Sequence, residues 1–425
     1  MRRIALMFAF AFLLFGVSSC KAGTITYDAG TNTITVVGFS ESSPCTFEDI
    51  YQADVANGWG VVSKQGGNQY YFSCKLQIGD DSTETWLIDM NKMIYEDVPI
   101  FLYIRGNGHV RLGKVINSEK KTTSGGCFIY ARKMNTYMVH MLQYASIELY
   151  STTLSASNRV FFGTSPNCQA KIWNCNFEHI DFSGNPIQID VYHLYFVHSN
   201  YGLRGIFTSA EDIRLANVNY ATTWINQHEP VIMKKIVTDK AEQRSFHIAD
   251  STANLYFIDT DWRWVGHFSS DSTSKVYRQY SFNLKVTDEE ENPISDAKVG
   301  VYDKNGNLEF EEMTDANGQI PEQIITRGYY DQAHGSTLVD FSPHTLVIEK
   351  EGYETYTMQF TPSESINWQI SLKKEEEKVG EVTTTEVKEE RKGKSDMSEG
   401  LVLGFGFGIA LLAIAFFVIK GGGRE

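Results

Sequence analysis

The sequence predicts an all-β protein in which a parallel β-helix precedes a smaller β-sandwich and a transmembrane helix. Three observations lead to this fold class. Residues 24–279 carry strand-like segments at a period of about 21 residues, residues 280–372 alternate as hairpins do, and residues 401–419 are apolar throughout. A count of only 9 Pro beside 22 Tyr and 26 Phe also suits a chain rich in strands.

The composition excludes two broad classes of protein. Hydrophobic residues at 42% and charged residues at 21% are typical of a globular chain, not a disordered one. The chain holds 38 Lys+Arg against 52 Asp+Glu, a formal net charge of −14. Proteins that bind nucleic acid usually carry a basic surface, so we expect no nucleic-acid partner.

Residues 1–22 have the pattern of a secretory signal peptide. Two arginines precede the short apolar run 4–17, and small residues follow it. The segment 17–20 also resembles a degenerate lipobox, so the sequence leaves open whether Cys20 carries a lipid.

The C-terminal residues predict a membrane anchor. At a rise of 1.5 Å per residue, residues 401–419 cover roughly the 30 Å hydrocarbon core as one helix. Lys420 and Arg424 follow, so the positive-inside rule places residues 420–425 in the cytoplasm. Charged residues outnumber all others in residues 373–399, which predicts a solvated stalk. We therefore expect a single-pass protein of the cell membrane with its ectodomain outside.

Five segments in the middle of the chain resemble one another, and each closes on Asn or Asp. They are residues 172–176, 196–200, 215–219, 235–239 and 257–261. A leucine-rich repeat would need leucines at fixed offsets, and a propeller blade needs about twice this period. A parallel β-helix fits, with one turn per repeat, an apolar interior and the closing polar residues stacked into a ladder at one bend.

On these repeats, roughly residues 24–275 resemble the right-handed β-helix superfamily, the pectin-lyase-like proteins. The resemblance implies a right-handed coil. Because this fold hosts many activities, it does not carry a function with it.

Residues 280–372 follow a different pattern. Its motifs are the alternating strand 282–288, Pro293-Ile, Ala297-x-Val-x-Val, Thr314-Asp-x-x-Gly and Lys350-x-Gly-Tyr. In this order they resemble the carboxypeptidase regulatory-like family, whose transthyretin-like sandwich of seven strands acts as a structural or interaction module. Asn305-Gly306 stands between alternating strands, as a two-residue hairpin turn requires. The stretch 327–341 is longer than the family pattern expects.

Two groups of residues resemble parts of polysaccharide-cleaving enzymes. The first, Asp80 and Asp81 followed by His109 and Arg111, is similar to the carboxylates and histidine of polygalacturonases. The flanking motifs of that family are missing, and we interpret residues 106–108 as a coil bend.

The second group is Asp259, Asp261, Trp262, Arg263 and Trp264. Pectate lyases use calcium-binding carboxylates with an arginine base, and tryptophans suit the faces of sugars. The interpretation that we prefer is a bend ladder with an aromatic cap at the end of the β-helix.

The sequence predicts no metal ligand and no cofactor. His179, His193 and His198 fall on adjacent coils, but no tight Cys/His spacing accompanies them, so we interpret them as isolated surface histidines. The segment 303–307 begins like a calcium loop, yet Leu308 stands where glycine is needed, which indicates a turn.

Five cysteines follow the signal sequence: Cys45, Cys74, Cys127, Cys168 and Cys175. Outside the cell, pairing of Cys168 with Cys175 and of Cys45 with Cys74 is one alternative. Five buried apolar thiols are the other.

The function expected from the sequence is that of a membrane-anchored, non-enzymatic surface protein. Its ectodomain would act in adhesion by binding surface glycans or proteins. The alternative is a tethered polysaccharide lyase or glycoside hydrolase, which a convergence of carboxylates in one groove would favour. We assign no catalytic residue, and the oligomeric state stays open.

Overall fold

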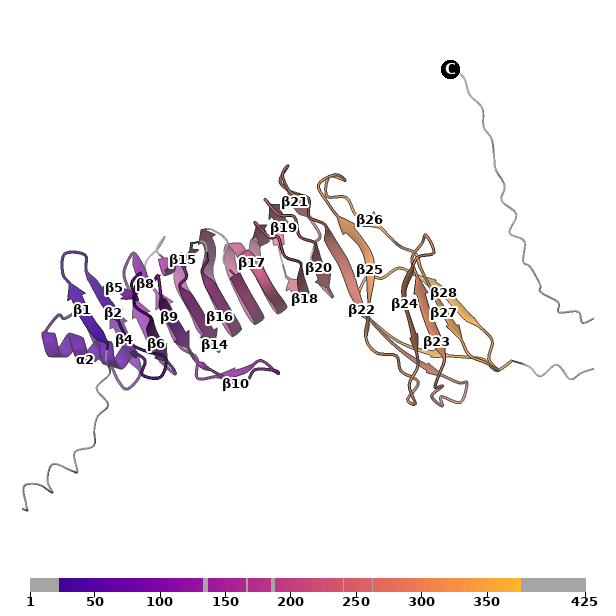
Figure 1. Cartoon of the computed structure of the whole chain (residues 1–425), viewed down its shortest axis with the longest axis horizontal. Coiled ribbons are helices and arrows are strands. Elements are labelled where there is room, and N and C mark those ends of the chain that lie inside the picture. Colours follow the sequence, from indigo (N-terminus) through magenta and orange to yellow (C-terminus); the bar gives the residue numbers. More distant parts are fainter. Residues whose placement is uncertain are drawn as a thin grey trace, which may run out of the picture. The chain divides into compact units, whose positions relative to one another are not determined.

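Parallel strand pairing organises the larger part of this protein into a β-solenoid of the right-handed type with about 8 turns (Figure 1). The structure is a computed structural model, and it describes residues 23–132, 137–165, 167–184, 188–239, 241–261 and 263–375. The prediction of an all-β chain built on a parallel β-helix is confirmed at this level. The predicted signal peptide 1–22, the stalk beyond Glu375, the apolar run 401–419 and the tail 420–425 lie outside the described residues.

The first turn is closed by a hairpin and a helix. Strands β1 (Thr24–Asp28) and β2 (Thr33–Val37) pair in antiparallel fashion, and helix α2 spans Phe47–Asn57. Thr46 caps the helix, because its hydroxyl accepts from the Asp49 amide while the Asp49 carboxylate accepts from the Thr46 amide. Gly58 ends the helix with φ of 67°, a left-handed conformation that favours glycine.

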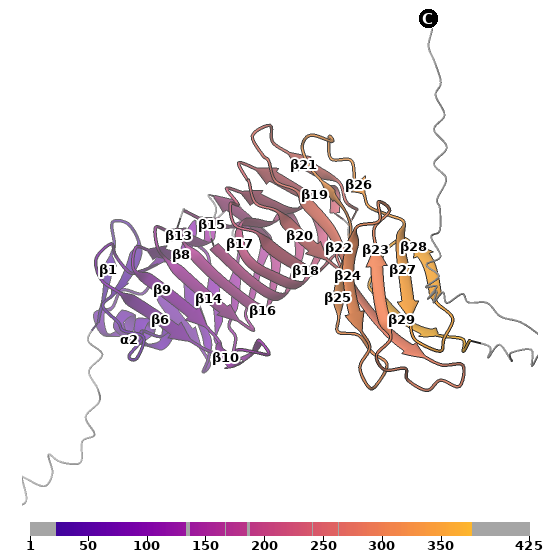
Figure 2. The same ribbon diagram turned by 45° about the vertical axis from the view of Figure 1, so that its right-hand side comes forward.

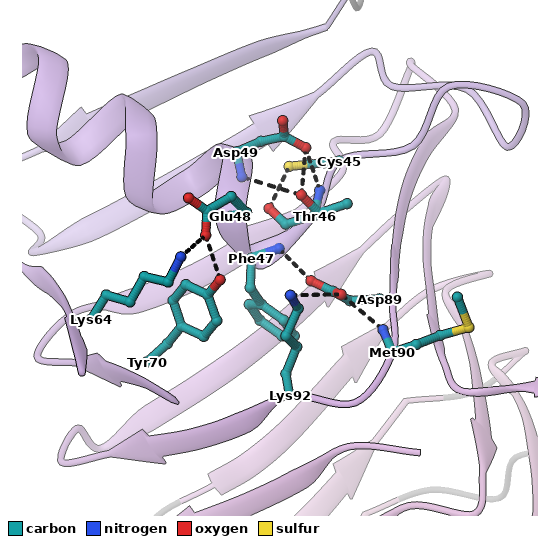
Figure 3. A network of polar contacts seen from close by, with 10 residues as sticks. All are labelled: Cys45, Thr46, Phe47, Glu48, Asp49, Lys64, Tyr70, Asp89, Met90 and Lys92. Atoms are coloured by element: carbon teal, nitrogen blue, oxygen red, sulfur yellow. Dashed lines mark hydrogen bonds and ion pairs between the residues drawn. The ribbon is translucent and has the colours of Figure 1, made fainter. Parts of the chain in front are cut away.

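Carboxylates fasten this helix to the first turns (Figure 3). Glu48 accepts hydrogen bonds of 2.5 Å from both Lys64 and the Tyr70 hydroxyl, and these lower the pKa of Glu48 to about 2. Buried Asp89 accepts from the Phe47 amide at 2.8 Å, which satisfies one of the free amides at the start of the helix. The helix is therefore tied by side chains to three strands outside it.

Each turn of the solenoid contributes strands to three faces of stacked parallel strands. We call the first the groove face, and its strands are β6 (Thr85–Asp89), β9 (Gly108–Leu112), β14 (Ser146–Tyr150), β16 (Gln169–Gly184), β17 (Gln188–Ile225), β18 (Val231–Thr238), β20 (Leu255–Ile258) and β22 (Val276–Thr287). The second face begins with β2, β5 (Lys75–Ile78), β8 (Ile100–Arg105) and β13 (Tyr137–Leu142) and ends with β19 (Ala241–Ala249) and β21 (Gly266–Phe268). The third face begins with β4 (Gln69–Phe72), β7 (Met93–Glu96), β12 (Phe128–Ala131) and β15 (Thr153–Thr164), and β3 (Val62–Gln65) pairs with β4 in antiparallel fashion. Strands β15, β16 and β17 bend and so serve more than one face.

A hairpin arm interrupts the repeat after β9. It consists of β10 (Lys114–Asn117) and β11 (Thr122–Ser124), which pair only with each other. The arm lengthens one turn, and both views show it beside β14 and β16 (Figures 1 and 2).

Inward side chains form one continuous apolar core. Phe162 stacks on Phe182 with ring centroids 4.9 Å apart, and Phe177 lies 5.8 Å from Phe196 on the next turn. These four rings are almost fully buried. Equivalent positions stack on successive turns, so each buried ring packs against side chains of its own turn and of the next turn.

Left-handed bends stack into a ladder along the solenoid, but not at the residues that the sequence predicted. The residues with positive φ at one bend are Ser151, Asn174, His193, Asp212, Lys235 and Asp259. Ile172 pairs with Val191, whereas aligning residues 172–176 with 196–200 would have paired it with Phe196, so the predicted register is wrong. The prediction failed because the repeating position is marked by its backbone conformation, with φ near 50°, and not by one residue type. His and Lys occupy this position as well as Asn and Asp.

The five cysteines of the described residues are buried, and no disulfide joins Cys45 to Cys74 or Cys168 to Cys175. Burial raises the pKa of Cys74 and Cys175 to about 12. They behave as small apolar side chains of the solenoid core.

A second core follows, enclosed by two sheets. One sheet contains the end of β22 with β25 (Gln323–Tyr330), β26 (Val339–Asp340) and β29 (Ile366–Ser371). The other contains β23 (Lys298–Tyr302), β24 (Leu308–Met313), β27 (His344–Glu349) and β28 (Tyr356–Phe360). Their inward residues, among them Phe282, Val299 and Ile348, form a cluster separate from the solenoid core. The expected boundary between 279 and 280 falls inside β22, which pairs with β20 in the solenoid and with β29 in the sheet.

Aspartates close the tight turns of these sheets. Asp303 accepts from the Asn305 and Asn307 amides, and Asp315 accepts from the Asn317 and Gln319 amides in the same way. The hairpin predicted around Asn305 is present between β23 and β24, but its loop covers 303–307 and is longer than two residues. Among the described residues, no helix has the length and apolar character needed to cross a membrane.

Candidate binding groove

A hollow of about 450 Å³ lies on the groove face, across strands β6, β9, β14, β16 and β17. Figure 2 shows the strands that carry it side by side. Its lining residues are Trp86, His109, Ser146, Ile147, Glu148, Gln169, Ala170, Lys171, Gln188, Asp190 and Thr208. Successive side chains of a strand point to opposite sides of the sheet. Most of the lining side chains therefore point outward, and the residues between them point into the core.

One row of the groove carries uncharged polar and aromatic side chains. The strand register places Trp86, His109, Ser146, Gln169 and Gln188 at equivalent positions of five strands. The Trp86 and His109 rings stack with centroids 4.5 Å apart, and His109 Nδ1 lies 2.6 Å from the Ser146 hydroxyl. Burial lowers the pKa of His109, which keeps this imidazole neutral near pH 7.

The neighbouring row carries charges of alternating sign. The register places Arg111, Glu148, Lys171 and Asp190 on consecutive strands, about 4.8 Å apart. Arg111 pairs with Glu148 and, at 2.7 Å, with Glu41. The four charges of this row sum to zero, whereas the charged residues that line the hollow, Glu148, Lys171 and Asp190, sum to −1 because Arg111 is not among the lining residues.

Aromatic side chains border the charged row. Trp173 donates from Nε1 to Asp190 at 3.2 Å, and Lys171 Nζ lies 5.4 Å from the centre of the Trp173 ring. From the hairpin arm, Lys121 Nζ lies 4.8 Å from the Tyr192 ring. Asn174 donates to the Lys121 carbonyl at 2.8 Å, so the arm is fixed against β16 at the edge of the groove.

This arrangement can bind a neutral, extended ligand but does not bring two carboxylates together. Glu148 and Asp190 lie two strands apart with Lys171 between them. Glu148 bonds Arg111, and Asp190 accepts from Ser209 at 2.6 Å as well as from Trp173. The groove therefore offers hydrogen-bond donors, acceptors and ring faces, with no free pair of acids.

The first group that resembled an enzyme is divided between two places. Asp80 accepts from the Ser82 and Thr83 amides, and Asp81 forms a two-pronged pair with Arg105. His109 lines the groove instead, and Arg111 lies in the charged row beside it. Gly108, the last residue of the predicted coil bend, begins β9, and a Cβ atom there would meet the Ile78 carbonyl oxygen at 2.2 Å.

The second group does surround a hollow, of about 300 Å³. Asp259, Asp261 and Trp264 line it together with Arg278, Tyr280 and residues 363–365. The Asp259 carboxylate accepts from the amide and the hydroxyl of Ser281, at 2.8 and 2.5 Å, and its φ is 50°. Asp259 therefore acts as a bend residue that holds β22. Arg263 is not among the lining residues, and Trp262 lies outside the described residues.

The histidines His179, His193 and His198 also lie at two different bends. His193 lies on the bend ladder, 2.6 Å from Asp212. His179 and His198 stack on a different bend with ring centroids 5.0 Å apart.

Sequence reasoning named His109 and Arg111 but missed Lys171, Gln188 and Asp190. A signal for them exists in the printed sequence. The strands of the groove read His-Val-Arg-Leu from 109, Ser-Ile-Glu-Leu from 146, Gln-Ala-Lys-Ile from 169 and Gln-Ile-Asp-Val from 188. Each places an uncharged polar or imidazole side chain and then a charged one on the same outward face.

Comparison with known proteins assigns no family. No family model matches the chain, and no curated protein matches it. Among solved structures, 3-chlorocatechol 1,2-dioxygenase from Rhodococcus opacus 1CP is 18% identical over 23% of this chain and 60% of its own, with a TM-score of 0.17. The Bacillus anthracis TIE protein is 16% identical over 25% of this chain and 20% of its own, with a TM-score of 0.19. The chain thus spans less than two thirds of either protein, and neither similarity carries an argument about function.

Proposed function

We propose that this chain is a membrane-anchored surface protein whose solenoid binds an extended glycan along the groove face, in adhesion rather than catalysis. The observation that carries the proposal is the groove itself, which repeats hydrogen-bonding side chains over five strands. Sugar units of a polysaccharide repeat along a line, so a row of similar side chains every 4.8 Å or so can follow such a chain.

The balance of charge in the groove indicates the kind of glycan. Arg111, Glu148, Lys171 and Asp190 alternate in sign, so a strongly anionic polymer gains no net attraction. Half-buried Trp86 lines the groove and offers aromatic surface at one end of it. A neutral or mixed-charge glycan fits these features best.

The anchoring part of the proposal rests on the sequence. Residues 1–22 would direct export, 373–399 would form a stalk, and 401–419 would cross the membrane. We also retain as proposals the relationship of the solenoid to pectin-lyase-like proteins and that of residues 280–372 to the carboxypeptidase regulatory-like family. Two sheets around one core are consistent with the latter.

A glycan array probed with the full-length protein tests the binding function. We expect binding to at least one neutral or mixed-charge glycan, and we expect Trp86→Ala and Lys171→Ala each to weaken it by about 10-fold or more. Lys75→Ala is the matched control, because Lys75 lies 4.9 Å from the Tyr103 ring on the second face and not in the groove. No binding on the array, or equal losses in all three variants, would contradict the proposal.

A second candidate function is a tethered polysaccharide lyase or hydrolase, favoured by the hollow that Asp259 and Asp261 share with Arg278 and Trp264. Its weak point is that the Asp259 carboxylate already bonds Ser281. A reducing-sugar assay and an assay for unsaturated products, run on every glycan that binds, distinguish this function from adhesion.

A further inference from the structure

Two histidines occupy equivalent bends on consecutive turns of the solenoid. His179 and His198 have φ of 57° and 56°, and Asn217, a further 19 residues along, has φ of 53°. Successive turns of a parallel solenoid lie about 4.8 Å apart, so side chains at one bend stack directly. The two imidazole rings accordingly lie 5.0 Å apart and only 18° from parallel.

The Glu178 carboxylate lies close to both imidazoles. Glu178 precedes His179, and the carboxylate of Glu178 and the imidazoles of both histidines each place one ligand atom within 4.8 Å of the others. Buried Ser155 is the strand partner of Glu178 and donates to its Oε2 at 2.9 Å. A hydroxyl that bonds one carboxylate oxygen fixes the orientation of the whole carboxylate. Hydrogen-bond partners of metal ligands commonly have this effect.

Two imidazoles and one carboxylate form a ligand set for a divalent transition metal. Zn²⁺ binds histidine nitrogen and carboxylate oxygen at about 2.0–2.2 Å, which puts neighbouring donors of a tetrahedral ion roughly 3.4 Å apart. Donors that already lie within 4.8 Å reach this separation by small side-chain rotations. His198 is exposed, so an ion can reach the site from solvent.

We propose that Glu178, His179 and His198 bind a divalent transition metal ion, with Zn²⁺ as the expected ion and a fourth position left to solvent or a ligand. Hard cations such as Ca²⁺ are disfavoured because two of the three ligands are nitrogens. The ion would join side chains of β16 and β17 and so link two consecutive turns. The site is separate from the groove and does not depend on the proposed glycan binding.

His193 supplies a matched control within the same strand. It also lies in a left-handed bend, with φ of 47°, and is exposed, but it faces Asp212 on the other ladder. Asparagine tolerates positive φ, so replacing any of these histidines by Asn removes the imidazole and keeps the bend.

The test uses full-length protein that has been stripped with a chelator and titrated with Co²⁺, whose visible absorption reports its coordination. We expect one saturable site per chain from which Zn²⁺ displaces Co²⁺. We expect His179→Asn and His198→Asn to weaken binding by at least about 10-fold, and His193→Asn to leave it unchanged. Lower pH should weaken binding in the wild-type protein, because protons compete for the imidazole nitrogens.

Thermal unfolding gives a second measurement that needs no cobalt. Zn²⁺ should raise the unfolding midpoint of the wild-type protein and of His193→Asn, but not of His198→Asn, because a ligand that binds the native state alone stabilises it. If an Asn variant fails to fold, Glu178→Gln takes its place in both experiments. Absence of a saturable site, or a loss in His193→Asn equal to that in His198→Asn, overturns the proposal.

Discussion

The solenoid and the two sheets that follow it turn the chain in different ways. In the solenoid, one bend is occupied by residues about 19–24 positions apart, and these stack on one another, as Asn174, His193 and Asp212 do. In the sheets, Asp303 and Asp315 each bond backbone amides two and four residues ahead. The comparison teaches that solenoid residues are constrained by neighbours distant in sequence, whereas turn residues of the sheets are constrained by their own loop.

The largest expected difference concerns thiol chemistry. Residues 280–375 contain no cysteine, so among the described residues a thiol reagent reports on the solenoid alone. A pKa of about 12 in place of 9.0 leaves Cys74, Cys127 and Cys175 with roughly 1000-fold less thiolate, and burial blocks access as well. We expect these thiols to react with an aromatic disulfide reagent at least that much more slowly in native protein than in guanidinium.

Counting the thiols provides the control for that experiment. In guanidinium without reductant, all five thiols of the described solenoid should react. A smaller number that reductant restores would reveal a disulfide, whereas the structure has none among these five cysteines.

The next effect concerns packing. Phe177→Ala should lower the free energy of unfolding by about 3–5 kcal/mol, because the ring is fully buried between Phe162, Phe182 and Phe196. Urea denaturation followed by circular dichroism measures the change. Phe177→Leu, which retains most of the volume, should cost clearly less, and equal costs would show that the stacked rings are not closely packed.

Acid should affect the two regions at different pH. Burial lowers the pKa of His109 and His140 in the solenoid, so the unfolded chain takes up protons below about pH 6.5 while the fold keeps these rings neutral. Stability from this source therefore falls as the pH drops from 7 towards 5. Hydrogen bonds from Asn292 and Gln319 lower the pKa of Asp288 and Asp315 in the sheets, and their contribution is full above about pH 4 and lost only below it.

Hydrogen exchange measured by mass spectrometry separates the two regions. Peptides of the solenoid should lose protection first as the pH is lowered from 7, and peptides of 298–320 should keep theirs until the turn carboxylates protonate. His140→Gln should reduce the loss in the solenoid. Simultaneous loss in both regions at mildly acidic pH would contradict this order.

The smallest expected effect is that of Asp261→Asn. The Asp261 amide bonds the Ile236 carbonyl, and an asparagine side chain leaves that backbone contact unchanged. We expect the fold to be retained and no lyase or hydrolase rate to change. A rate loss of about 100-fold on any polysaccharide would instead favour the enzyme function, since general acids and bases contribute on that scale.

The sequence allowed the parallel solenoid to be predicted, because short apolar strands recur at a nearly constant period. It did not allow the register to be predicted, because the repeating bend accepts Ser, Asn, His, Asp and Lys alike, as Lys235 illustrates. The row of groove residues was even harder to predict from the sequence. Its equivalent residues His109 and Ser146 are 37 positions apart since the hairpin arm intervenes, whereas Gln169 and Gln188 are only 19 apart. Uneven spacing hides the row until the strands are paired.

Strand β22 has a mechanical consequence. Its first residues pair with β20 at the end of the solenoid, its last residues pair with β29, and β25 runs antiparallel along most of its length. A force that pulls the end of the sheets away from a surface-bound solenoid would have to break the backbone hydrogen bonds of β22 either to β20 or to β25 and β29 before the two cores separate. Two neighbouring cores that share such a strand resist tension as a single body.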